Sequence, residues 1–407
     1  MAQQSTRVGR SVAGRASTSS ALAIAAANRA GPIRAKTSAP ARPSAPAAPI
    51  LKPIVGSPAP WFKAPVLDGN PEYTFHTVAG RVTLLFFVGS AESEAVRGKL
   101  AELLAHDLFD DRACSLFIVT HDPEDARSGR IQNRLPGVRV VLDYDRAISD
   151  AYGASRLGGD GYDPYVMVLD RQLRVAGRYL LPRADESLIL AERLIGEAGV
   201  EDWAPVLSVP RVLDQAMCRQ LMDLYDADGG SDSGFMREVD GKTVQLIDYG
   251  HKRRSDFTID DSELCRSLRA RIGHCVRPAI QRAFNFDATR MERYIVACYE
   301  AELGGHFRPH RDNTTKGTAH RRFAVTINLN EDFDGGELRF PEFGSRTYRA
   351  PPGGAIVFGC GLLHEATPVT RGRRYAFLPF LYDDAAAAER EANNKYLGEG
   401  VGDYTRG

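Results

Sequence analysis

Residues 304–312 read GGHFRPHRD, and residues 361–377 read GLLHEATPVTRGRRYAF. The two stretches hold His310, Asp312 and His364, and Arg374 follows the last histidine by ten residues. Two imidazoles and one carboxylate can occupy one face of an iron(II) ion and leave the other face open for a chelating co-substrate and oxygen. An arginine beyond them can hold the far carboxylate of that co-substrate through two parallel hydrogen bonds. These four residues are therefore the predicted catalytic set.

The segments around these motifs have the pattern of short strands separated by Gly/Pro turns. They are RYIVACY (293–299), RRFAVTINLN (321–330), GELRF (336–340), GGAIVFG (353–359) and RYAFLPFLY (374–382). Ahead of them, apolar residues recur at four-residue intervals from Leu264 to Phe284, which is typical of a long amphipathic helix that Pro278 kinks. Helices followed by many short strands favour a jelly-roll sheet packed against helices.

The stretches GGHFRPHRD, FDGGELRF (333–340) and LLHEATPVTRGRRYAFLPF (362–380) resemble the prolyl 4-hydroxylase-type branch of the 2-oxoglutarate/iron(II) dioxygenases. The resemblance covers about residues 290–382 and implies a double-stranded β-helix, or jelly roll. It implies that His310, Asp312 and His364 bind Fe(2+), and that Arg374 pairs with the distal carboxylate of 2-oxoglutarate. It further implies that O2 is consumed and that succinate and carbon dioxide are released. L-ascorbate is a candidate reductant for oxidised iron, and the sequence leaves its requirement open. A peptidyl or amino-acid side chain is the favoured substrate of this hydroxylation.

Several residues near the motifs are weaker candidates. Tyr299 ends the strand before the HxD pair and is predicted to contact 2-oxoglutarate, with a core tyrosine as the alternative. Arg373 is the alternative to Arg374, on the opposite face of the same strand. His306 and His320 are interpreted as solvated loop residues, with a substrate-loop role as the alternative. Arg321 and Arg322 either meet an acidic substrate or start a strand with charge. The basic run HKRRSDF (251–257) is interpreted as a solvated turn, with substrate contact as the alternative, and Gly335-Gly336 as a tight turn.

The first half of the chain has the pattern of an α/β domain. VTLLFFV (82–88), 114–120 and 138–142 are continuous apolar runs, as expected of strands buried on both faces. A helix is predicted between the first two, a hairpin over 165–180, and a closing helix over 185–197. Together with VGSPAPWFKAPVLDG (55–69) and YDPYVMVLDRQLRVAGRY (162–179), this order resembles the thioredoxin-like fold, and more narrowly the peroxiredoxins. The resemblance implies a cis-proline at Pro164.

The thiol that a peroxiredoxin needs is missing from its expected place. In that family the nucleophile follows the first long core strand, where this chain reads VGSAESEAV (88–96). Ser90 and Ser93 are poor substitutes, because a hydroxyl is hardly ionised and cannot cycle through sulfenic acid. Cys114 opens the second core strand and is predicted to be buried. The domain is therefore predicted to be catalytically silent and to serve docking, dimerisation or substrate presentation.

The composition of the chain limits which functional classes remain. The chain has 407 residues, 43% of them hydrophobic, and zero formal net charge. It has no basic block typical of a nucleic-acid binder and no apolar run long enough to span a membrane. Six cysteines without regular spacing favour free thiols in the cytoplasm over disulfides or zinc.

Four segments follow from these patterns. Residues 1–50, rich in Ala, Pro, Ser and Arg, are predicted to be a disordered tail. A peroxiredoxin-like domain is predicted over 51–200, a dioxygenase domain over 201–390 and a C-terminal tail over 391–407. Two alternatives to an iron dioxygenase remain: a non-catalytic protein that senses iron or 2-oxoglutarate, and a thiol peroxidase that uses Cys114.

Overall fold

The structure is a computed structural model that describes residues 52–155, 161–197 and 202–405. The predicted N-terminal tail, residues 1–50, lies outside the described residues. Within the described part of the chain, every helix is too short or too polar to cross a membrane.

Residues 82–180 form a five-stranded sheet in the order β5-β4-β3-β6-β7. β3 runs parallel to β4, and β4 parallel to β5, whereas β6 and β7 form an antiparallel hairpin beside β3. All residues of β3, β4 and β6 are buried, which explains their continuous apolar sequences. The strands are β3 (Val82–Gly89), β4 (Cys114–Thr120), β5 (Val138–Leu142), β6 (Tyr165–Leu169) and β7 (Val175–Leu180).

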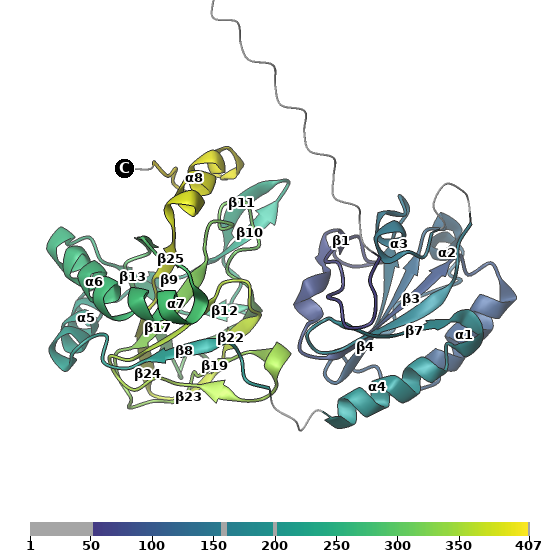
Figure 1. Cartoon of the computed structure of the whole chain (residues 1–407), viewed down its shortest axis with the longest axis horizontal. Coiled ribbons are helices and arrows are strands. Elements are labelled where there is room, and N and C mark those ends of the chain that lie inside the picture. The colour runs from purple at the N-terminus through teal and green to yellow at the C-terminus, as the bar shows by residue number, and fades with distance from the viewer. Residues whose placement is uncertain (1–51, 156–160, 198–201, 406–407) are drawn as a thin grey trace, which may run out of the picture. The chain divides into compact units, whose positions relative to one another are not determined.

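Alternate residues of β3 bury opposite faces of this sheet. Leu84 and Phe86 pack with α1 and α4, whereas Leu85 and Phe87 pack with Tyr152 on the other face. Figure 1 shows α1 and α4 along one face. The remaining elements are β1 (Lys63–Ala64), β2 (Tyr73–Thr74), α1 (Glu94–Leu104), α2 (Pro123–Arg127), α3 (Ala147–Tyr152) and α4 (Glu186–Gly196), with short 3-10 turns at Phe75–Val78 and Leu181–Arg183.

One expectation for this region is wrong. Pro164 was expected after a cis peptide bond, but within the described residues the cis bond lies at Leu135-Pro136. The backbone at Pro164 instead continues directly into β6, and its carbonyl accepts a hydrogen bond from the Leu181 amide. The strand order and hairpin otherwise agree with the sequence pattern.

Residues 206–382 form two further sheets. The larger one follows the order β14-β25-β17-β24-β15-β13-β9, with β21 and β8 joined beside β17, and the smaller one follows β12-β16-β22-β19-β20. The larger sheet contains β8 (Val206–Val209), β9 (Ser231–Asp232), β13 (Ser255–Thr258), β14 (Arg290–Glu292), β15 (Ile295–Glu300), β17 (Phe323–Asn328), β21 (Ala355–Gly359), β24 (Arg373–Phe377) and β25 (Phe380–Tyr382). The smaller one contains β12 (Lys252–Arg253), β16 (His306–His310), β19 (Leu338–Arg339), β20 (Thr347–Tyr348) and β22 (His364–Ala366).

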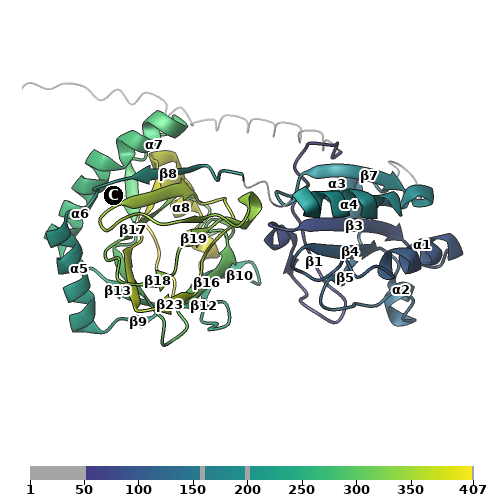
Figure 2. The same cartoon turned by 90° about the horizontal axis from the view of Figure 1, so that it is seen from below.

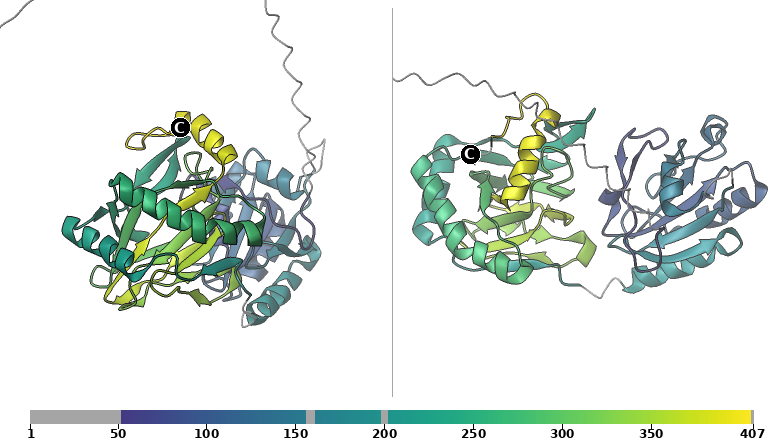
Figure 3. Two further views of the ribbon diagram at one scale, coloured as in Figure 1. Left: turned by 60° about the vertical axis from the view of Figure 1, so that its left-hand side comes forward. Right: turned by 45° about the horizontal axis from the view of Figure 1, so that its top comes forward.

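Three helices cover the outer face of the larger sheet (Figures 2 and 3). They are α5 (Gln215–Asp228), α6 (Ser262–Cys275) and α7 (Arg277–Phe284). The predicted long helix is divided at Val276, because Pro278 occupies the first turn of α7 and cannot continue the hydrogen bonding of α6. Its apolar stripe packs against Val296, Cys298 and Phe377. The alternate residues, including Ala297 and Tyr299, face the smaller sheet.

Two hairpins and a C-terminal helix complete this region. They are β10 (Phe235–Val239) with β11 (Lys242–Leu246), β18 (Asp334–Gly335) with β23 (Val369–Arg371), and α8 (Asp384–Ala392). Gly335, expected in a tight turn, lies in β18 at an irregularity of its pairing with β23, and both Gly335 and Gly336 have positive φ. A β-carbon at Gly335 would meet the Pro368 carbonyl oxygen at 2.1 Å, so only glycine fits there.

Candidate active site

The two predicted histidines face each other across a pair of strands. His310 ends β16, His364 begins β22, and the antiparallel pairing makes them register partners. Asp312 follows β16 by two residues, and its backbone amide donates to the Cys360 carbonyl. The ligand atoms of the three side chains all lie within 4.8 Å of one another. The fold therefore brings all three predicted metal ligands together.

Backbone carbonyls orient both imidazoles. His310 Nδ1 lies 2.8 Å from the Arg308 carbonyl oxygen, and His364 Nδ1 lies 3.0 Å from that of Leu362. A carbonyl only accepts, so each Nδ1 carries a hydrogen, and Nε2 is the ring atom left for a metal. The two Nε2 atoms lie 3.6 Å and 3.3 Å from the Asp312 oxygens. Both rings therefore turn the same nitrogen toward the carboxylate.

The protonation states also suit a cation. Burial lowers the pKa of His310 to about 4, with a further contribution from His364. Burial acts to raise the pKa of Asp312, but the neighbouring His364 and His310 outweigh it and hold that pKa below its usual range. Near neutral pH the site thus offers the neutral imidazole of His310 and the carboxylate of Asp312. Phe307 stacks on His310 at 3.4 Å between centroids and covers one side of the site.

Arg374 lines the same cavity as the three predicted metal ligands. His310, Asp312, His364 and Arg374 all contribute to its wall. Arg374 is only 2% exposed and donates to two neutral oxygens, Asn328 Oδ1 and Thr326 Oγ1. Within the described residues no carboxylate forms an ion pair with it. A buried guanidinium without an acid partner fits the carboxylate of an incoming co-substrate.

The Arg373 side chain lies on the opposite face of β24, because successive side chains of a strand alternate. Its guanidinium pairs with Asp226 and Glu300 on the side of the helices. Tyr299 is 3% exposed and lines the same cavity as Arg374, whose guanidinium lies 5.2 Å from the centre of its ring. The structure therefore places Tyr299 and Arg374 at the cavity and Arg373 away from it.

The basic run at 251–257 is not the solvated turn that sequence patterns favoured. Lys252 is 3% exposed and Arg254 is 7% exposed. Arg254 makes two hydrogen bonds of 2.7 Å to the Asp256 carboxylate and a third, of 3.2 Å, to the Tyr299 hydroxyl. Arg254 immediately precedes β13 and Asp256 lies in it, and residues two apart along an extended segment face the same side. The spacing of Arg254 and Asp256, two residues apart, was the sequence feature that could have indicated this buried ion pair.

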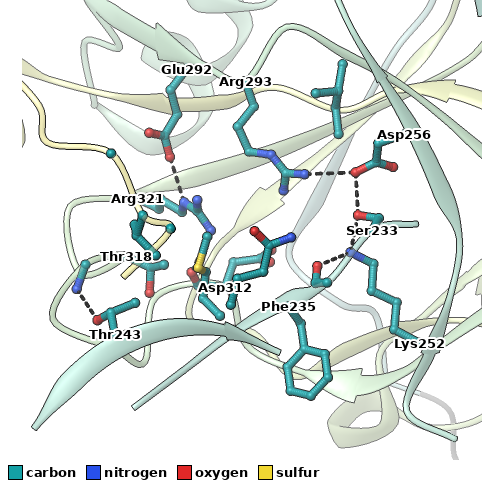
Figure 4. Close-up of a pocket in the computed structure, with 18 of the residues that line it drawn as sticks. Ser233, Phe235, Thr243, Lys252, Asp256, Glu292, Arg293, Asp312, Thr318 and Arg321 are labelled. Atoms are coloured by element: carbon teal, nitrogen blue, oxygen red, sulfur yellow. Dashed lines mark hydrogen bonds and ion pairs between the residues drawn. The ribbon is translucent and has the colours of Figure 1, made fainter. Parts of the chain in front are cut away.

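A second, outer cavity of about 500 Å³ opens beside His310 and Asp312. Figure 4 shows Glu292, Arg293 and Arg321 directed into it near Asp312. Arg321 donates to Glu292 at 2.7 Å and is 9% exposed. Sequence patterns did not single out Glu292 or Arg293, since both belong to a short edge strand and the turn after it.

His320 also differs from expectation. It was interpreted as a solvated loop residue, but it is 1% exposed and its Nε2 lies 3.1 Å from the Glu292 carboxylate. Glu292 is contributed by another strand, so no local pattern could show this burial. His306 is half-buried and contacts the Gly304 carbonyl, and Arg322 pairs with Glu389 away from the cavity. The segment after α8, expected to be a free tail, lines the outer cavity through Asn394, Leu397 and Tyr404.

Comparison with known families agrees with this site. Residues 294–382 match the model of the 2OG-Fe(II) oxygenase superfamily, and residues 55–178 match that of the AhpC/TSA family. The chain joins a 2OG-Fe(II) oxygenase domain to a redoxin domain. All of the predicted site residues, Tyr299, His310, Asp312, His364 and Arg374, lie within the oxygenase match. The fusion predicted from the sequence motifs is therefore confirmed.

Curated PKHD-type hydroxylases are also similar to part of the chain. A PKHD-type hydroxylase of Synechococcus sp. (strain JA-2-3B'a(2-13)) is 32% identical over 122 residues, which are 27% of this chain and 54% of that protein. The chain thus spans about half the length of that relative. A PKHD-type hydroxylase of Phenylobacterium zucineum (strain HLK1) is 27% identical over 184 residues, 42% of this chain and 74% of that protein.

Two solved structures are also similar. A prolyl-4-hydroxylase of Pseudomonas putida is 20% identical with a TM-score of 0.34, covering 46% of this chain and 95% of its own. A viral collagen prolyl hydroxylase from Paramecium Bursaria Chlorella virus-1 is 17% identical with a TM-score of 0.34, covering 45% of this chain and 98% of its own.

The redoxin domain has no thiol where peroxide chemistry would need one. Ser90 follows β3 and donates to the Asp122 carboxylate at 2.7 Å. Cys114 is fully buried, and burial raises its pKa to about 12. A thiol that is neither exposed nor ionised cannot attack a peroxide at an appreciable rate.

Proposed function

We propose that the protein is an iron(II)- and 2-oxoglutarate-dependent dioxygenase that hydroxylates an amino-acid or peptidyl side chain and releases succinate and carbon dioxide. The observation that carries the proposal is that His310, Asp312 and His364 line one cavity together with Arg374, which is buried and has no ion-pair partner among the described residues. Three metal-ligating groups and a buried guanidinium in one cavity suit a dicarboxylic keto acid, which needs both a chelation site and a carboxylate site.

Each of the site residues has a defined role in this proposal. His310, Asp312 and His364 hold the metal, and the carbonyls of residues 308 and 362 keep both Nε2 atoms directed at it. Arg374 binds the distal carboxylate of 2-oxoglutarate, and Tyr299 positions it. Phe307 and Phe358 pack on the two imidazoles and keep water from that side. The iron and its co-substrate supply the oxidising chemistry, which needs a dry, fixed cavity.

The two domains are proposed to have a jelly-roll fold over about residues 290–382 and a thioredoxin-like fold over about 51–200. The two opposed sheets of the oxygenase domain and the mixed five-stranded sheet of the redoxin domain support these assignments. We propose that the redoxin domain docks a partner or substrate without catalysing peroxide reduction, since Cys114 is inaccessible. A cytoplasmic location and a role for L-ascorbate are retained as proposals.

A turnover assay that measures succinate tests this function. The full chain with iron(II), 2-oxoglutarate and oxygen is expected to form succinate slowly without substrate and faster when a substrate pool is added. His364→Ala serves as the inactive control. Binding of 2-oxoglutarate and iron without any succinate, in the presence of oxygen and extracts rich in peptides and amino acids, would favour the sensor alternative.

A further inference from the structure

We propose that Arg293 anchors a carboxylate of the substrate beside the metal site, so that the hydroxylated molecule is an acid held by its anionic group. This inference rests on the proposed dioxygenase function and names the chemical class of its substrate. It assigns to Arg293 a role in substrate positioning that is separate from the binding of 2-oxoglutarate.

Arg293 lies where the two cavities of the oxygenase domain meet. It lines the cavity that contains Arg374 and also the outer cavity of about 500 Å³. His310 and Asp312 line both cavities as well. A substrate in the outer cavity would therefore lie beside Arg293 and beside two of the predicted metal ligands. The guanidinium is therefore positioned to contact substrate as well as to support the fold.

The backbone at Arg293 directs its side chain into the cavity. Arg293 has φ of +63°, in the left-handed region that bulky residues rarely occupy. It follows β14, and the preceding residue Glu292 also points inward, although successive strand residues normally face opposite sides. Figure 4 shows both side chains directed to the same side. Strained conformations of this kind persist at binding sites, where the surrounding structure holds them.

The charge around Arg293 is not balanced by the protein. Asp256 already accepts two hydrogen bonds of 2.7 Å from Arg254, and Arg293 reaches the same carboxylate only at 3.3 Å. The other nearby carboxylate, Glu292, contacts both Arg321 and Arg390 at 2.7 Å. Four arginines thus share these two carboxylates, and Asp312, which also lines the outer cavity, belongs to the predicted metal-ligand set.

The unbalanced charge is accessible from the cavity. The Arg293 side chain is 31% exposed, whereas that of its partner Asp256 is 12% exposed. Arg293 and Arg321 both lie over the ring of Phe380, at 5.6 Å and 4.1 Å from its centroid. An anion placed between these guanidinium groups would gain charge-assisted hydrogen bonds in a site partly shielded from water. The single contact with Asp256, at 3.3 Å, leaves the other N–H donors of the Arg293 guanidinium available to an anion.

Paramagnetic relaxation by manganese(II) bound in place of iron tests the proposal without turnover. The full chain is loaded with manganese(II) and 2-oxoglutarate, and proton relaxation is measured for free L-amino acids, each paired with its own carboxamide. A second arm compares N-acetyl-glutamate amide with N-acetyl-glutamine amide. The first arm reports a main-chain carboxylate and the second an acidic side chain. The relaxation of 2-oxoglutarate protons, measured in the same samples, reports the co-substrate site.

The protons of at least one acid should show a paramagnetic relaxation enhancement roughly tenfold larger than those of its amide. This ratio corresponds to one charge-assisted hydrogen bond. Arg293→Gln should abolish that difference while 2-oxoglutarate stays relaxed, and Arg293→Lys should retain part of it. Arg371→Gln, on an exposed hairpin, is the matched control. Equal or absent relaxation of acids and amides, or a preference that survives Arg293→Gln, would overturn the inference. Unrelaxed 2-oxoglutarate in the wild-type chain would overturn the dioxygenase function as well.

Discussion

Tyr299 and Arg374 are register partners on the adjacent antiparallel strands β15 and β24. Their side chains therefore share the inner face of the sheet, and Arg373 must lie on the outer face. This pairing decides which of two consecutive arginines reaches the co-substrate cavity. It also explains why a tyrosine from a strand that precedes the HxD pair lies beside an arginine from a strand that follows the second histidine.

Arg374→Gln should weaken 2-oxoglutarate binding by about ten- to a hundredfold, because the substitution removes a charge-assisted interaction of about 1.5–3 kcal/mol. Metal binding should remain, since Arg374 contacts none of the metal ligands directly. Calorimetric titration of 2-oxoglutarate into the manganese-loaded chain measures the effect. Arg373→Gln is the control and should leave the affinity unchanged. The opposite pattern would mean that the co-substrate lies on the other face of β24.

His310→Ala and His364→Ala should each reduce metal affinity by more than the ~100-fold that loss of an outer-shell partner costs. The remaining two ligands cannot enclose an iron(II) ion. Metal content after dialysis against a weak chelator measures the loss. His306→Ala removes a histidine from the same strand β16 and should keep its metal, because His306 contacts backbone carbonyls instead. Full metal content in either of the first two variants would refute the ligand assignment.

Asp256→Asn should destabilise the oxygenase domain by about 3–5 kcal/mol, since it leaves the buried Arg254 without its carboxylate. Burial opposes ionisation of Asp256, but Arg254 and Lys252 lower its pKa from 3.8 to about 2. A depressed carboxyl pKa stabilises the fold above its unfolded value of about 4, and this stability is lost as the pH falls toward 2. Urea unfolding at several pH values measures both effects. The variant should lose less stability than wild type below pH 4, and parallel curves would contradict the assignment.

Cys114→Ala should not change the rate of peroxide consumption, because the native thiol is buried and protonated. A thiol reagent added to the native protein should modify the partly exposed Cys265 and Cys275 well before Cys114. Mass spectrometry of peptides after brief labelling measures the order. Early labelling of Cys114, together with peroxide consumption that the substitution abolishes, would restore the peroxidase alternative.

The clustering of His310, Asp312 and His364 could be predicted from the sequence because its signals are local. The HxD pair lies at the end of one strand, His364 begins another, and the alternation of residues 373 and 374 along β24 separates the inward arginine from the outward one. The buried runs of the redoxin sheet were equally visible, since a strand covered on both faces has a continuous apolar sequence.

The polar interior could not be predicted in the same way. Lys252, Arg254 and His320 have the composition of exposed loops, yet they are buried. Lys252 donates to Ser233 Oγ and the Gly234 carbonyl, and His320 meets Glu292, so these partners lie far away in the sequence. Arg254 pairs with the nearby Asp256, which also meets the distant Arg293. A buried polar group needs hydrogen-bond partners, and the sequence does not show which distant residues supply them.

The central claim is that the three ligands and Arg374 together hold an iron(II)·2-oxoglutarate chelate. Anaerobic addition of iron(II) and 2-oxoglutarate to the metal-free full chain should produce a weak visible charge-transfer band. The band should be lost in His310→Ala and should require more 2-oxoglutarate in Arg374→Gln. A well-folded wild-type chain that gives no band at saturating iron(II) and 2-oxoglutarate would contradict the account.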